Sequence, residues 1–200
     1  MGFSFSWLAV EAASADTVLE GCGLRPTGTV HADSDGAYCF ACLPNGWTVI
    51  FSQVFVFAED ERLAGLSRDG ARAIGCQIDQ DALYCRVACF RDGRVLWSLT
   101  HDSSQGPRHL ASEGALPDGF YDIRNRLEAE QDANDAGDAD SDFIFEIPIE
   151  VADLVCGYRD DRGDCGGDPF VFSDAEPVGG YTEAASAEPW WRKNPFGGTK

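Results

Sequence analysis

The sequence lacks any long hydrophobic run. No apolar stretch approaches the roughly 20 residues that a helix needs to span a bilayer, and the longest, Trp47–Ala58, contains Ser52 and Gln53. The first ten residues also lack the basic leader and the small-residue cleavage site of an export signal. We therefore expect a cytoplasmic protein that has no membrane partner.

Basic residues are scarce. The chain has 15 Lys and Arg against 34 Asp and Glu, a net charge of -19. A field of that sign repels the phosphates of nucleic acids and anionic lipid headgroups. The charge therefore argues against nucleic acid as a partner and favours a basic protein, or no partner at all.

Catalytic motifs are lacking too, and His31, His101 and His109 are the only histidines. No Gly-x-Ser-x-Gly elbow is present. The glycine-rich fragments at 21–23 and 163–168 have neither the flanking strand and helix nor the Lys of a phosphate-binding loop. The sequence therefore indicates a non-enzymatic protein with no catalytic residue and no cofactor.

Eight cysteines are present, but their spacing does not fit a metal or redox site. The Cys39–Cys42 pair precedes a Pro-Asn-Gly turn rather than a helix, and no second pair completes a zinc site. Cys85 and Cys89 lie four residues apart on one expected strand, too far to share a metal easily. We expect no metal and reduced, buried thiols, with Cys156 and Cys165 the pair most prone to oxidise.

What the sequence does have is the composition of a folded domain. Of its 200 residues, 44% are hydrophobic and 12% aromatic, and this length can bury a sizeable core. Alternation predicts a first strand near residues 3–10, and Asn45-Gly46 predicts a hairpin between its two flanking strands. The expected elements of the first hundred residues are a helix after Ser14, strands at 37–43 and 47–57, a helix at 59–66, and strands at 71–79, 82–90 and 94–101.

The second half is expected to be mainly helical. A helix should start at Pro117, an acidic loop should cover Gln131–Asp142, and a last helix should run from Pro148 until Gly157. The sequence thus predicts an α+β fold, mainly an antiparallel sheet of hairpins with a few helices packed on it. We expect one domain over residues 1–158, an irregular acidic extension with an aromatic and basic tail over 159–200, and a monomer or weak dimer.

Four segments carry a resemblance. Phe3–Val10, Leu43–Trp47, Arg94–Trp97 leading to His101-Asp102, and Phe143–Val155 together resemble a family of uncharacterised bacterial α+β proteins. The likeness covers most of residues 1–158 and transfers no activity and no catalytic residue. In type, a small acidic α+β protein also resembles the immunity proteins that neutralise bacterial toxins.

These observations favour a protein-binding module that occludes a basic partner, for example as an immunity-type inhibitor of a basic toxin or nuclease. Long-range attraction would speed the encounter, and buried aromatic side chains would prolong the complex. The predicted contact residues are Glu128, Glu130, Asp132, Asp135, Asp138 and Asp140, with Trp190 and Trp191 as anchors.

Two alternatives remain open. One is an enzyme with an acid/base cleft around His101, with Asp102 and Glu113 as partners, although neighbouring residues of a strand point to opposite faces. The other is an acidic mimic of nucleic acid, which requires carboxylates spaced like phosphates.

Overall fold

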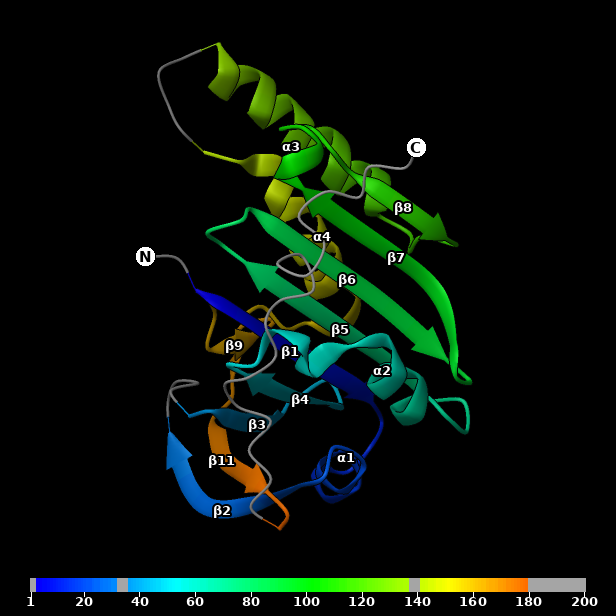
Figure 1. Cartoon of the computed structure of the whole chain (residues 1–200), viewed down its shortest axis with the longest axis vertical. Helices are drawn as coiled ribbons and strands as arrows, with labels where there is room; N and C mark the ends of the chain where they lie inside the picture. The colour runs from blue at the N-terminus through cyan, green and yellow to red at the C-terminus, as the bar shows by residue number, and fades with distance from the viewer. Residues whose placement is uncertain (1–2, 32–35, 137–140, 180–200) are drawn as a thin grey trace, which may run out of the picture.

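The computed structural model describes residues 3–31, 36–136 and 141–179 of the chain. Across these ranges an antiparallel sheet of nine strands is formed, in the order β2-β11-β3-β4-β1-β5-β6-β7-β8 (Figure 1). A second, two-stranded sheet is the hairpin of β9 (Asp164–Cys165) and β10 (Asp168–Pro169). The strands of the large sheet are β1 (Ser4–Glu11), β2 (Leu24–His31), β3 (Tyr38–Cys42), β4 (Trp47–Ser52), β5 (Arg72–Asp79), β6 (Tyr84–Arg91), β7 (Arg94–Asp102), β8 (Ala111–Gly114) and β11 (Phe172–Pro177).

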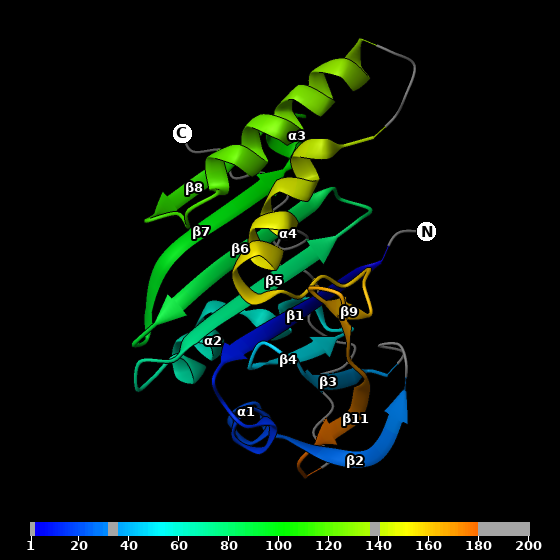
Figure 2. The same cartoon turned by 180° about the vertical axis from the view of Figure 1, so that it is seen from behind.

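Helices cover both faces of the sheet. Figures 1 and 2, which view opposite sides, show α1 (Ala15–Gly21) and α2 (Asp60–Leu66) on one side and α4 (Phe143–Cys156) against β5, β6 and β7 on the other. The helix α3 (Phe120–Asp135) packs on α4. Short 3-10 turns, η1 (Phe55–Ala58) and η2 (Ser103–Gln105), follow β4 and β7. The predicted α+β class with a mainly antiparallel sheet is confirmed.

The central strands are apolar on both faces. On β1, Trp7 and Ala9 contribute to the core under α3 and α4, whereas Leu8 and Val10 contribute to the core under α1 and α2. Every residue of β4 is buried. A strand between two helical layers meets water on neither face, so most of its side chains are apolar and a polar one such as Ser6 is hydrogen-bonded.

The hairpin at Asn45-Gly46 forms as predicted, with Gly46 at φ 91° in the left-handed region that glycine tolerates. The second strand, however, ends at Ser52 instead of continuing to Phe57. Its termination has a hydrogen-bonding cause, because the Ser6 hydroxyl donates to the Val54 carbonyl at 2.8 Å and accepts from the Ala58 amide at 3.3 Å. These bonds hold the chain in the η1 turn instead of the sheet.

The helices of the second half differ from expectation at their ends. The helix α3 begins at Phe120, after Gly119 in the left-handed region, and runs to Asp135, so part of the expected acidic loop 131–142 is helical. Similarly, α4 begins at Phe143 and contains Pro148, because Asp142 caps it by accepting from the Phe145 amide at 3.0 Å.

The segment after Tyr158 is not irregular as expected, and the domain does not end at residue 158. The strand β11 lies inside the large sheet, where Ser173 pairs with Phe40 of β3 and with Val30 of β2. Phe172 packs against Tyr158 with ring centroids 6.2 Å apart, which gives this segment an apolar anchor. The part of the predicted extension from residue 180 onward lies outside the described residues.

Within the described ranges, no helix is long and apolar enough to cross a membrane.

Candidate functional site

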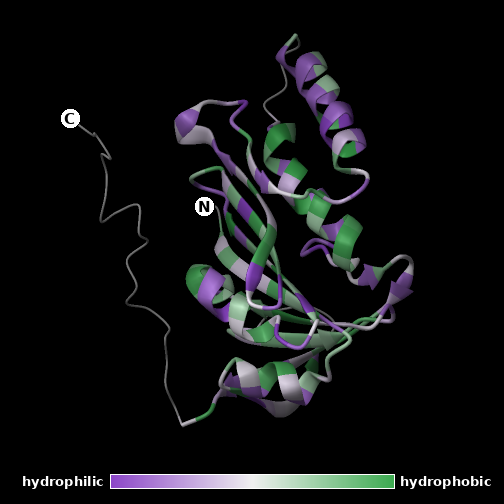
Figure 3. Cartoon of the chain, turned by 90° about the vertical axis from the view of Figure 1, so that its right-hand side faces the viewer, coloured by the Kyte–Doolittle hydropathy of each residue, from purple (hydrophilic) through white to green (hydrophobic). Residues whose placement is uncertain are grey.

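One side of the molecule carries a concentration of acidic side chains, which we call the acidic face. It consists of exposed and half-buried carboxylates on α3, α4 and the segment after α4; Figure 3 shows α3 as largely hydrophilic. The carboxylates are those of Asp122, Glu128, Glu130, Asp132, Asp135, Glu146, Glu150, Asp153 and Asp161. The arginines that reach this face are Arg108, Arg124, Arg126, Arg159 and Arg162.

The predicted contact residues that the structure describes all lie on α3. Glu128 and Glu130 each accept from the arginine four positions earlier, at 2.9 Å. Asp132 and Asp135 both bind Arg108, at 2.6 and 2.5 Å. Hydrogen bonds from Arg108 and then Gln131 hold the pKa of Asp135 below its ordinary value. The other predicted contact residues, Asp138, Asp140, Trp190 and Trp191, lie outside the described residues.

Ion pairs also join α3 to α4. Arg126 of α3 binds Glu130 of its own helix and Glu150 of α4. Arg159 binds Glu146 at 2.6 Å and Asp161 at 2.8 Å. Every arginine of this face is thus engaged by a carboxylate, and nine carboxylates against five guanidinium groups leave a surplus of negative charge.

The three residues of the alternative acid/base cleft do not converge. His101 is 0% exposed; its Nδ1 lies 2.8 Å from the His109 carbonyl, and its Nε2 lies 3.3 Å from the Asp142 carboxylate. The second contact lies outside hydrogen-bonding geometry and is electrostatic. The Asp102 carboxylate accepts a hydrogen bond from the Ser104 hydroxyl of η2 at 2.6 Å. Glu113 is exposed on β8. This arrangement fixes a loop to the start of α4 and leaves no room for a substrate at the imidazole.

The contact with His101 affects the pKa of Asp142. Burial alone would raise the pKa of Asp142, but the His101 imidazole and the Phe145 amide outweigh it and hold the pKa below its ordinary value. The pair therefore stabilises the fold at pH values where Asp142 is ionised, and that contribution is lost as acid protonates the carboxylate.

No disulfide joins the cysteines of the described residues. Cys39 is buried and Cys42 exposed on opposite sides of β3, so the pair is not a site; the burial expected of Cys42 was wrong. Cys156 and Cys165 are both buried, and no disulfide joins them. Burial raises the pKa of Cys156 to about 12, which makes this thiol a poor nucleophile at neutral pH. Within the described part of the chain, no group of three or more His, Cys, Asp and Glu could hold a metal ion.

A cavity of about 510 Å³ lies beside α4, where several segments meet. It is the largest of three cavities that we compare in the described structure; the others measure about 310 and 240 Å³. The cavity is lined by Phe3, Ser4, Phe5, Phe51, Gln53, Gln80 and Asp160. Sequence reasoning missed this site, because the lining comes from two strands, a turn and a loop that are distant along the chain.

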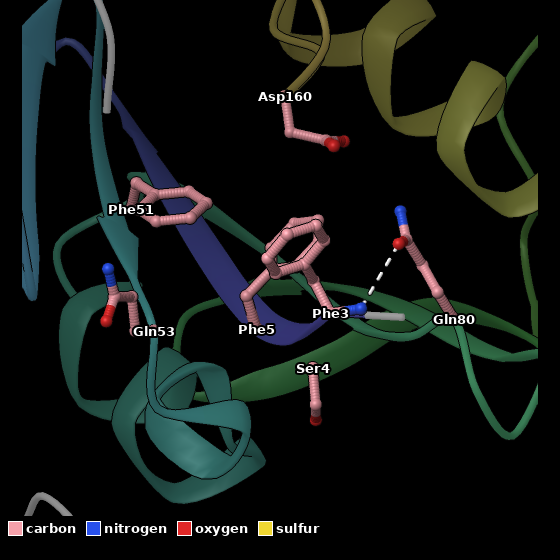
Figure 4. A pocket seen from close by; sticks show the side chains of 7 residues that line it. All are labelled: Phe3, Ser4, Phe5, Phe51, Gln53, Gln80 and Asp160. Atoms are coloured by element: carbon pink, nitrogen blue, oxygen red, sulfur yellow. Dashed lines mark hydrogen bonds between the residues drawn. The ribbon is translucent and has the colours of Figure 1, made fainter. Parts of the chain in front are cut away.

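Figure 4 shows how the side chains of the cavity lie. Asp160 enters from the segment after α4 and faces Gln80 across the open space, with the rings of Phe3 and Phe5 below. The Phe5 and Phe51 rings pack at 5.3 Å, whereas Phe3 is 72% exposed at the rim. Gln80 is positioned by accepting from the Phe3 amide at 3.2 Å. The Asp160 carboxylate, the Gln80 amide and the phenylalanine rings therefore lie around one space, whereas the Gln53 amide lies apart from Asp160 and Gln80 (Figure 4).

Asp160 is the most perturbed acid in this region. The pKa of its carboxyl is raised to about 6, chiefly by burial; the negative charges of Asp161 and Glu146 also raise it, whereas a hydrogen bond from its own backbone amide and the charge of Arg159 lower it. Such a group titrates just below neutral pH. A carboxyl with a perturbed pKa in a cavity is a marker of binding and catalytic sites.

Comparison of the chain with protein-family models, with curated proteins and with solved structures finds no match.

Proposed function

We propose that the chain is a non-enzymatic, cytoplasmic protein-binding module that engages a basic protein partner through the acidic face. The observation that carries this proposal is the surplus of carboxylates on a face whose arginines are all in use. A basic partner meets attraction there, and among the described residues of this face no arginine is left without a carboxylate partner to repel it.

The proposed mechanism is occlusion. The field of a chain with net charge -19 speeds the encounter, and the surface of α3 and α4 then covers the partner. An immunity-type inhibitor of a basic toxin or nuclease works in this manner. The internal ion pairs favour this role, because α3 is held to α4 by Arg126 and presents its carboxylates on a supported surface.

The test compares two doubly neutralised variants of equal net charge. The first, Asp132→Asn with Asp135→Asn, alters the acidic face; the control, Glu20→Gln with Glu61→Gln, alters exposed acids on α1 and α2. A partner captured from the source cell is purified, and its association rate with each variant is measured over a range of salt concentrations. We expect the first variant to associate several-fold more slowly and with weaker salt dependence than the control.

Equal rates for the two variants would contradict a role for the acidic face. An association rate that is indifferent to salt for the parent protein would remove electrostatic steering altogether, because exposed charges are screened within about 8 Å at physiological ionic strength.

A further inference from the structure

The carboxylate in the cavity has no counter-ion of its own. Within the described residues, no Lys, Arg or His forms an ion pair with Asp160, and its neighbour Arg159 is taken up by Glu146 and Asp161. A half-buried carboxylate without a counter-ion loses hydration and gains no compensating charge. Near neutral pH it stays ionised at a cost in stability, and a cation from outside would offset that cost.

The residues that line the cavity indicate which kind of cation would fit. Aromatic rings attract cations over their faces, and three phenylalanines line this space. Gln80 presents an amide group toward Asp160, and an amide oxygen can accept from more than one N–H donor. A metal ion fits poorly, since a hard cation needs about six oxygen ligands and the cavity offers a single carboxylate. A nitrogen cation with N–H donors and an apolar stem fits both kinds of wall.

We propose that this cavity binds the guanidinium or alkylammonium head of an organic cation, with Asp160 as its counter-ion and Phe3, Phe5 and Phe51 around its stem. The proposal does not depend on the acidic face, because none of the residues of that face lines the cavity. The volume of about 510 Å³ lies within the range of small-ligand sites.

The test titrates the full chain with N-acetyl-arginine amide at pH 7.5 and follows binding by calorimetry and by the side-chain amide signals of the glutamines in NMR spectra. N-acetyl-citrulline amide, which has nearly the same shape and no charge, is the matched ligand control. We expect the arginine probe to bind at least about tenfold more tightly than the citrulline probe, as a charge-assisted contact requires.

Two variants and one control variant test whether the probe contacts Asp160 and Phe3. Asp160→Asn should lower the affinity for the arginine probe at least about tenfold. Phe3→Ala should lower that affinity about two- to fivefold. Asp118→Asn, which removes an exposed carboxylate on the loop before α3, should leave the affinity unchanged. Melting temperatures of all three variants establish that each is folded at the temperature of the titration.

Binding should also weaken at low pH. With the Asp160 carboxyl titrating near 6, lowering the pH from 7.5 to 5 should reduce affinity about tenfold. The charged groups that act on this carboxyl are Arg159 and Asp161 beside it and Glu146 on α4. Asp160→Asn should abolish this pH dependence.

A further pair of probes separates the two sources of such a cation. Agmatine carries the guanidinium without a peptide backbone, whereas blocked Ala-Arg-Ala carries it as a side chain. Tighter binding of agmatine supports a free amine as the ligand, and tighter binding of the tripeptide supports an arginine side chain of a protein. No binding of any guanidinium probe at about 10 mM, an affinity weaker than about -3 kcal/mol, would overturn the proposal, as would an unchanged affinity in Asp160→Asn.

Discussion

Replacement of Asp160 by Asn should make the protein more stable at neutral pH. In the folded chain the pKa of Asp160 is about 6 against an ordinary value of 3.8, chiefly because the carboxyl is buried. The folded state therefore binds this proton more tightly than the unfolded state, and the free energy of unfolding falls as the pH rises from about 4 to about 6. Above pH 6 the full penalty of the ionised carboxylate remains.

The magnitude follows from the shift. A difference of 3.8 to about 6, at about 1.36 kcal/mol for each pH unit, gives a penalty of roughly 3 kcal/mol at pH 7.5. Asp160 keeps part of its surface in water, which reduces this figure, so we expect about 2 kcal/mol. Asparagine has the same shape and no charge to desolvate, so the variant should recover this free energy.

The assay is urea unfolding of the parent protein and of Asp160→Asn at pH 4, 5, 6 and 7.5. The stability difference should be small at pH 4 and should grow to about 2 kcal/mol in favour of the variant at pH 7.5. The control Asp118→Asn should show no such growth, since that carboxylate is exposed. A difference that is constant over this pH range, or a variant that is less stable at pH 7.5, would refute the reasoning about Asp160.

Four further predictions concern the body of the fold. Ser6→Ala should lower the free energy of unfolding by about 1–3 kcal/mol in urea unfolding, because it leaves the Val54 carbonyl and the Ala58 amide without their partner. Tyr158→Phe should leave stability unchanged or raise it, since the buried hydroxyl has no hydrogen-bond partner among the described residues; a clear loss would reveal one. Gly114→Ala should lower stability by at least about 1–3 kcal/mol, because φ is 77° and a Cβ would lie 2.1 Å from a carbonyl oxygen of β7. Addition of EDTA should leave the melting temperature unchanged, and a drop of many degrees would mean that a bound metal supports the fold.

The strands that the sequence predicts well are those with a repeated pattern and a turn. The alternation around Trp7 indicates β1, and Asn45-Gly46 indicates the hairpin of β3 and β4, because each signal is local and comes from the backbone geometry itself. By contrast, β2 carries Pro26 and Gly28 and is exposed along most of its length, so its residues are typical of a turn. It is a strand because β11 pairs with it, and no local signal reports that pairing.

The site residues differ in the same way. The carboxylates of α3 could be found from their density in the sequence, but their arginine partners could not all be found. The i,i+4 pairs on α3 are visible in the sequence, whereas Arg108 reaches Asp132 and Asp135 from a loop that only the fold brings near. The cavity at Asp160 is wholly a product of such long-range contacts, since its lining extends from Phe3 to Asp160.

The position of Asp160 is imposed by its neighbours. Of the two residues directly before it, Tyr158 is 1% exposed and packs edge-on against Trp7, and Arg159 is tied to Glu146 on α4. Because both of these residues are held in place, the backbone at Asp160 has little freedom to carry the carboxylate into water. A buried charge that lowers stability is typical of functional sites, where activity requires the charged group. Here the function would be to serve as a preorganised counter-ion for a cation. The variant Asp160→Asn separates the two readings in one protein. A variant that gains stability and loses affinity for guanidinium shows that stability and binding are opposed at this residue, whereas a variant that gains stability and keeps its affinity shows that the buried charge serves no ligand.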